Sequence, residues 1–191
     1  MAVNMQVNLG GLLMKNPVTT ASGTFASGHE YADFIDVGAL GAVTTKGVSL
    51  NGWAGNDAPR IAETPFGMLN SIGLQNPGVE VLKQRDLPWL KDQNATVIVN
   101  VSGHSLDEYA AVVDSLEESN EVDAYELNIS CPNVDCGGMT FGTDPTMAAS
   151  VVAECRKRTK HPLIVKLTPN VTDITAVSYT HLRAHETGRN L

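Results

Sequence analysis

Five short runs of β-branched and aliphatic residues recur along the chain, and each precedes a Gly-rich loop or a stretch with helical periodicity. They predict strands at Pro17–Ala21, Ala42–Lys46, Thr96–Val101, Tyr125–Ser130 and Leu163–Leu167. Their near-continuous apolar character is typical of strands covered on both faces, as in a parallel sheet. Strand followed by helix, repeated five times, favours an α/β fold: a doubly wound sheet or part of a (β/α)8 barrel.

Helix-start signals support this interpretation. Ser105–Glu108 has the pattern of a capping box before an amphipathic segment. Asp144 followed by Pro145 places an N-cap residue before a proline in the first turn. A third helix is predicted over Val79–Leu90, although Pro88 interrupts it, because proline removes a helical hydrogen bond.

Chain length bears on the choice of architecture. A complete (β/α)8 barrel needs about 250 residues, so 191 residues hold only its first five strands. As a barrel, the chain would be truncated after about five strands, formed by residues 1–176, with a non-native or disordered tail over 177–191; the doubly wound sheet stays open at this point. Arg60–Glu63 predicts a small hairpin within a long connection, and Asn170–Ile174 predicts the start of a fifth helix.

Charge and composition exclude several classes of protein. The net charge is -8, with 13 Lys and Arg against 21 Asp and Glu, which is the wrong sign for a nucleic-acid partner. No apolar run approaches the roughly 18 to 20 residues that cross a bilayer, and the first residues lack a secretion signal. We expect a cytoplasmic protein. Three cysteines, an odd number, argue against a disulfide framework.

Polar side chains lie at or near the end of each predicted strand. They are Ser22, Lys46, Asn100, Asn128 and Lys166. In α/β folds the carboxyl ends of the strands form the ligand-binding face, so these side chains predict one convergent site. The Gly-rich loops that follow let a backbone approach a ligand, but none has the GxGxxG or Walker pattern of nucleotide sites.

The segment Leu127–Pro145 (LNISCPNVDCGGMTFGTDP) carries a candidate reactive thiol. Cys131 and Asn133 follow the fourth strand in a loop, where a thiol can act as a base or nucleophile. Cys155, within a predicted helix, is interpreted as a small core residue. The alternative for Cys131 and Cys136 is an iron–sulfur set, but a fourth ligand is missing.

A second loop and the tail leave other interpretations open. Asn70, in Gly67–Pro77, suits a planar ligand with alternating C=O and N–H groups; the alternative is an Asn-rich turn network. His181 and His185 have the i, i+4 spacing of a helical metal pair, without an evident third ligand.

Seven motifs occur in an order that resembles the catalytic subunit of dihydroorotate dehydrogenase. They are KNPVTTASG, TTKGVS, GMLNSIGLQNPG, NVSG, LNISCPN, FGTDP and VKLTPNVTDI, between Met5 and Ala176. The GLQNPG form and the CPNV-x2-GG-x2-FGTDP loop are most similar to the 1B, NAD-linked class rather than the fumarate-linked class.

The resemblance implies a TIM barrel with FMN at its C-terminal mouth, oxidising (S)-dihydroorotate to orotate in de novo pyrimidine (UMP) biosynthesis. It makes Cys131 the base that removes the C5 proton while the C6 hydride passes to the flavin. The implied cofactor-binding residues are Ser22, Lys46, Gly47, Asn100, Asn128 and Lys166. The implied substrate-binding residues are Lys46, Asn70, Ser71, Ile72, Gly73, Leu74, Asn128 and Asn133.

The resemblance also implies partners. In the 1B class, electrons leave to NAD through a subunit that carries FAD and a 2Fe-2S cluster, and the full-length protein is expected to form a homodimer. Two other functions stay open: a flavin domain similar to dihydropyrimidine dehydrogenase, and a non-catalytic fragment that binds a metal or cluster.

Overall fold

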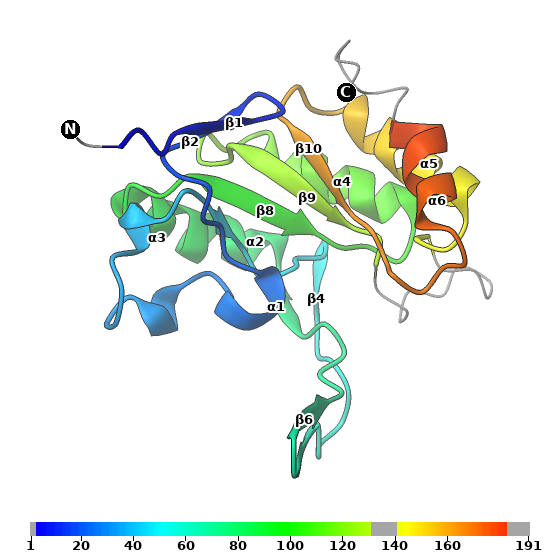
Figure 1. Ribbon diagram of the computed structural model, residues 1–191, viewed down its shortest axis with the longest axis horizontal. Coiled ribbons are helices and arrows are strands. Elements are labelled where there is room, and N and C mark those ends of the chain that lie inside the picture. Colours follow the sequence, from blue (N-terminus) through cyan, green and yellow to red (C-terminus); the bar gives the residue numbers. More distant parts are fainter. Residues whose placement is uncertain (1–2, 131–140, 183–191) are drawn as a thin grey trace.

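A four-stranded parallel sheet forms the centre of the protein (Figure 1). The computed structural model describes residues 3–130 and 141–182, with side chains as far as Ser178. The strands, in their order across the sheet, are β10 (Leu163–Lys166), β9 (Ala124–Asn128), β8 (Val97–Val101) and β3 (Val43–Thr44). Each neighbouring pair is parallel, so the expected α/β class with a parallel sheet is confirmed.

The first predicted strand, Pro17–Ala21, is wrong as a full strand. A single parallel bridge between Thr19 and Ala42 stands in its place beside β3. The side chain of Thr20 replaces a backbone acceptor beside β3, because its Oγ1 accepts a hydrogen bond from the backbone N–H of Thr44 at 2.9 Å. A threonine hydroxyl that competes for a backbone partner in this way interrupts regular pairing.

The described helices are α1 (Ser22–Phe25), α2 (Val79–Val81), α3 (Leu87–Asp92), α4 (Leu106–Leu116), α5 (Pro145–Arg156) and α6 (Ile174–Leu182). Two of them, α4 and α5, begin where their predicted caps lie. Ser105 caps α4 by accepting a hydrogen bond from the backbone N–H of Glu108. Asp144 caps α5 in the same way through the N–H of Met147. Two short 3-10 turns cover His29–Tyr31 and Val37–Ala39.

The predicted helix Val79–Leu90 forms in three pieces. Between α2 and α3 the chain makes a π-helical turn over Leu82–Asp86, and the N–H of Leu87 donates to the carbonyl of Leu82. Pro88 then lies in the first turn of α3, where its missing N–H is tolerated. The wider turn therefore resolves the conflict between helical periodicity and proline.

Alternate residues of the sheet face two different layers. On the helix side the core contains Val97, Val99, Val101, Tyr125, Leu127 and the apolar face of α4. On the other side, Ala42, Ile98 and Ala124 pack against Leu12 and Met14. Those two residues come from the hairpin of β1 (Val7–Leu9) and β2 (Leu12–Met14), which covers the amino ends of the strands (Figure 1).

The long connection between β3 and β8 leaves the body of the protein. β4 (Asn51–Trp53) pairs with β7 (Asn76–Gly78), and β5 (Ile61–Thr64) pairs with β6 (Gly67–Asn70) in a projecting hairpin (Figure 1). The hairpin predicted around Arg60–Glu63 is confirmed.

The C-terminal part continues the alternation with α6. The helix start predicted at Asn170–Ile174 is confirmed, and Asp173 Oδ1 accepts a hydrogen bond from the N–H of Thr175 at 2.9 Å. The expected boundary after residue 176 falls inside α6, and Val177 belongs to the main core. Within the described residues, no helix is long and apolar enough to span a membrane.

Candidate functional site

The inner face of the sheet changes from apolar to polar along the strand direction. On β8 the alternate residue after Ile98 is Asn100, and on β9 those after Ala124 are Glu126 and Asn128. The parallel register places Asn100 beside Glu126 and Asn128 beside Lys166. Polar side chains from neighbouring strands are thereby gathered at the carboxyl ends of the sheet, as the sequence predicts.

Asn100 carries an unpaired acceptor at the centre of this face. The side chain is fully buried, and its Nδ2 donates a hydrogen bond to Glu126 Oε1. Its Oδ1 is buried yet accepts no hydrogen bond within the described part of the chain. A buried carbonyl without a donor is costly, so this atom is a candidate acceptor for a ligand N–H or O–H.

Gly47 lets the backbone come close to the same atom. A Cβ added at Gly47 would lie 2.6 Å from Asn100 Oδ1 and 3.0 Å from Ser102 Oγ. Any larger residue would therefore clash with the amide carbonyl. The close approach explains why the loop after β3 has glycine at this position.

Asn128 is held by the side chains of Ser130, just beyond β9, and of Tyr109 in α4. Its Oδ1 accepts a hydrogen bond from Ser130 Oγ at 2.7 Å, and its backbone carbonyl accepts one from the Tyr109 hydroxyl at 2.7 Å. Tyr109 lies in the buried first turn of α4. The helix thus fixes the end of β9.

A cleft of about 610 Å³ lies beside these strand ends. Its lining includes three of the predicted site residues, Ser22, Lys46 and Ile72. Ser22 is buried at the start of α1, and Lys46 is half-buried directly after β3. The predicted convergence is therefore present for the loops after the first two predicted strands.

Other predicted residues lie elsewhere or outside the described chain. Asn70 and Ser71 are exposed at the base of the β5–β6 hairpin, and Lys166 is exposed on β10; none of the three is among the described residues that line the cleft. Cys131 and Asn133 lie outside the described residues.

The segment Asn70–Gln75 is held by Asn56, which the sequence did not single out, and by Arg60 of the predicted hairpin. Asn56 Nδ2 donates to the Ser71 carbonyl at 3.0 Å, and Arg60 Nη1 donates to Gln75 Oε1 at 2.9 Å. Gly73 has φ +72°, and a Cβ there would lie 2.7 Å from the backbone nitrogen of Asn56. The open alternative of an Asn-rich turn network within Gly67–Pro77 is represented by Asn76, whose Nδ2 donates to the Leu74 carbonyl at 3.0 Å and whose Oδ1 accepts a hydrogen bond from the N–H of Gly78 at 3.0 Å.

A buried carboxylate forms the outer wall of the cleft. Asp86 accepts hydrogen bonds from Ser27 Oγ at 2.9 Å and from Arg85 Nε at 2.6 Å, and His29 Nε2 lies 3.1 Å away. The His29 ring stacks on Trp89, with centroids 4.0 Å apart. Burial alone raises the pKa of Asp86, but the hydrogen bonds and the charge of Arg85 outweigh it, and the pKa is lowered.

Asp86→Asn is expected to destabilise the protein at neutral pH by about 2 kcal/mol, the scale of a hydrogen bond between charged groups. Because the pKa of Asp86 is lowered on folding, its contribution is present above the unfolded pKa of about 3.9 and is lost as pH falls further. Urea unfolding at several pH values measures both effects. The variant should lose stability less steeply than the wild type below about pH 4. Asp33→Asn, which changes an exposed carboxylate, is the matched control; equal losses in both variants would contradict the role of Asp86.

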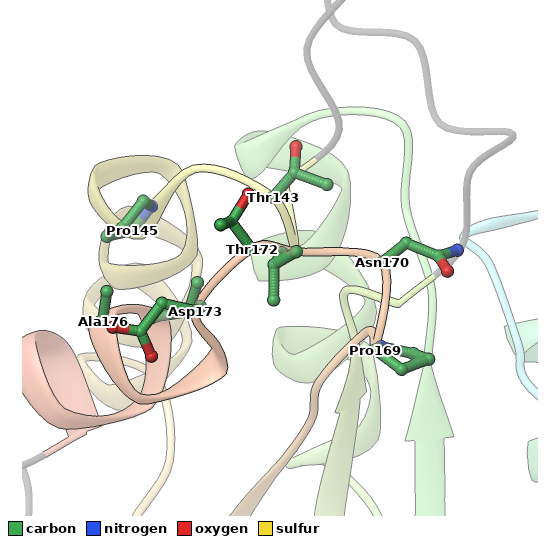
Figure 2. A pocket seen from close by; sticks show the side chains of 9 residues that line it. Thr143, Pro145, Pro169, Asn170, Thr172, Asp173 and Ala176 are labelled. Carbon is green, nitrogen blue, oxygen red and sulfur yellow. The ribbon is translucent and has the colours of Figure 1, made fainter.

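A second hollow, of about 650 Å³, lies between the loop after β10 and the first turns of α5 and α6. Figure 2 shows Thr143, Thr172 and Asp173 around it. None of the predicted site residues belongs to its described lining. We therefore place the candidate site in the cleft beside Lys46 and at Asn100.

Comparison with known proteins identifies the family. The family model described as dihydroorotate dehydrogenase matches residues 4–189. The chain belongs to the dihydroorotate dehydrogenase family. It is 54% identical over 176 residues to the dihydroorotate dehydrogenase B (NAD(+)) catalytic subunit of Alkaliphilus metalliredigens. It is 57% identical over 176 residues to the protein of the same name from Lachnoclostridium phytofermentans. Each match covers 92% of this chain and 58% of the relative, so the chain spans little more than half the length of these relatives.

A solved structure shares the fold of this family member. DHODH from Eimeria tenella, crystallised in complex with ferulenol, superposes with a TM-score of 0.72. The two chains are 21% identical, and the match covers 92% of this chain and 56% of the other. The likeness supports the α/β architecture with its parallel sheet.

Sequence reasoning missed Glu126, although a signal for it was present. Glu126 precedes Asn128 by two residues, and side chains two apart on a strand share one face. A polar side chain on the inner face of a buried strand therefore pointed to the site. Asp86 had no comparable signal, because its partners Ser27 and His29 come from a segment almost sixty residues earlier.

Proposed function

We propose that the full-length protein is the catalytic subunit of a class 1B dihydroorotate dehydrogenase, which oxidises (S)-dihydroorotate to orotate with FMN. The names of relatives that are 54% and 57% identical support this activity. The observation that carries the proposal is the buried Asn100 Oδ1, which accepts no hydrogen bond in the described chain and lies so close to Gly47 that no larger residue fits there. FMN fits these residues because its ring offers a flat face and a donor N–H.

The residues proposed to hold FMN are Ser22, Lys46, Gly47, Asn100, Asn128 and Lys166. Asn100 accepts a hydrogen bond from the ring, and Gly47 allows the ring to approach the backbone. Lys46 supplies positive charge at the edge of the cleft, which favours a carboxylate substrate and negative charge on the cofactor. Bound FMN supplies the acceptor for the hydride that leaves C6 of dihydroorotate.

The substrate residues are proposed from the family resemblance. Lys46, Asn128, Asn133 and the loop Asn70–Leu74 orient dihydroorotate. Cys131, as a thiolate, takes the proton from C5, while the electron pair of the C6–H bond leaves with the hydride. The C5=C6 double bond of orotate results. A thiol suits this step because its ordinary pKa of about 8.5 lies near working pH.

The sheet is proposed to be part of a (β/α)8 barrel in which residues 1–176 supply about the first five strands. Its parallel order and the hairpin that covers the amino ends of its strands support this arrangement. Electrons are proposed to pass to NAD through a partner subunit with FAD and a 2Fe-2S cluster, as in the NAD-linked class, with the full-length catalytic subunit as a homodimer.

The purified full-length protein tests this function directly. We expect one FMN per chain and anaerobic bleaching of its visible absorbance by dihydroorotate. Dihydrouracil, which lacks the carboxylate, should not bleach it; faster bleaching by dihydrouracil would favour an activity of the dihydropyrimidine dehydrogenase type. Protein that binds zinc or iron stoichiometrically and no flavin would contradict the proposal.

A further inference from the structure

The geometry points to Glu126 as a positioning residue that determines which end of the Asn100 amide faces the cofactor. This inference rests on the proposed function, because it assigns the group in front of Asn100 to FMN. Glu126 does not need to touch the ligand. It acts by holding Asn100 in one of the two orientations that an amide can adopt.

The contacts of the two side chains establish this orientation. Asn100 and Glu126 are register partners on β8 and β9, and the amide Nδ2 donates to the carboxylate Oε1. An ionised carboxylate only accepts hydrogen bonds, so it binds the NH₂ end of the amide and not the carbonyl end. The Asn100 carbonyl is left facing Gly47, buried and without a donor in the described chain.

The backbone around the amide leaves little freedom to compensate. Asn100 is fully buried, and its own N–H donates to Thr45 Oγ1 at 3.3 Å. If the amide turned over, its NH₂ group would face Gly47 and its carbonyl would face the carboxylate. The ligand group at this point must therefore be a donor, such as the N–H in the pyrimidine half of a flavin ring.

Two substitutions, made singly and together, test the orientation of the Asn100 amide rather than the mere presence of polar groups. In Glu126→Gln, glutamine can donate or accept, so the Asn100 amide is no longer fixed. In Asn100→Asp, two carboxylates face each other. In the double variant, the NH₂ end of the introduced glutamine binds one oxygen of the introduced carboxylate and leaves its other oxygen as an acceptor for the ligand, with the net charge of the pair unchanged. The pattern of donor and acceptor is thus restored with the roles reversed.

The measurements are made on the full-length apoprotein titrated with FMN. The FMN dissociation constant, from quenching of flavin fluorescence, should rise about tenfold in each single variant, the loss of one buried hydrogen bond. In the double variant it should return to within about threefold of the wild type. The visible absorption maximum of bound FMN should shift in the single variants and return in the double variant. Glu118→Gln, an exposed carboxylate paired with Lys83, is the matched control and should bind FMN as the wild type does.

Thermal unfolding of each apoprotein shows whether a loss of FMN affinity comes from the amide orientation or from a loss of folding. Restored affinity and spectrum in the double variant, with all variants folded, support the inference. Additive losses in the double variant, or a Glu126→Gln variant with wild-type affinity and spectrum, would overturn it while leaving the proposed function intact. A wild-type protein that binds no FMN would instead remove the proposed function, and this inference with it.

Discussion

Cys131→Ser in the full-length protein is expected to slow reduction of FMN by dihydroorotate about 100- to 1000-fold at neutral pH, within the usual contribution of a general base. A serine hydroxyl is a far weaker acid than a thiol, so it offers almost no anion to accept the C5 proton. The difference in rate between the wild type and the variant should narrow as pH rises, because more of the serine hydroxyl is then ionised. Anaerobic stopped-flow absorbance measures the rate, and the FMN dissociation constant should be unchanged.

Cys155→Ala is the matched control for loss of a thiol. Cys155 is fully buried in α5, and burial raises the pKa of its thiol to about 12, so it is neutral at working pH. Its replacement should leave the rate of FMN reduction unchanged. Equal rates in wild type and Cys131→Ser, across the pH range, would remove Cys131 from the role of base.

Gly47→Ala in the full-length protein is expected to weaken FMN binding about 5- to 150-fold, if the usual 1 to 3 kcal/mol of overpacking falls on the bound state. The added Cβ would lie 2.6 Å from Asn100 Oδ1, and Asn100 cannot withdraw without breaking its hydrogen bond to Glu126. The methyl group therefore takes the space in front of the amide. Titration of the apoprotein with FMN gives the affinity, and thermal unfolding gives any loss of stability.

Gly67→Ala provides the matched control. Gly67 begins β6 in the projecting hairpin, and no described atom lies within 4 Å of a Cβ placed there. Its replacement should change neither FMN affinity nor stability. Wild-type FMN affinity in Gly47→Ala would show that the space beside Asn100 is not where the cofactor binds.

The elements that sequence predicts best are those whose signals are local. The caps at Ser105 and Asp144 lie within three residues of the N–H groups they accept from, so a short pattern suffices to predict α4 and α5. Apolar runs likewise predict β8, β9 and β10 to within two residues at either end. The run Pro17–Ala21 is also rich in β-branched residues, but its pairing depends on the contact between Thr20 and β3, and no local pattern contains that contact.

In the candidate site, too, some residues are predictable from local signals and others are not. Asn100 and Asn128 are predictable because the carboxyl ends of parallel strands meet at one edge of a sheet. The cluster at Asp86 is not, because Ser27 and His29 reach it across the fold.

The sequence by itself was enough to indicate the family, an α/β fold with a parallel sheet, and the polar residues at the strand ends. The signals for these features are motifs and runs of residues that lie close together along the chain. Only the tertiary structure decided that Asn100 keeps a buried acceptor without a donor in the described chain, that Glu126 holds the other end of its amide, and that Gly47 approaches it closely. Register between β8 and β9 brings the first two together, and the close approach of the loop after β3 completes the arrangement. Such contacts join residues from separate strands, so only folding sets their distances.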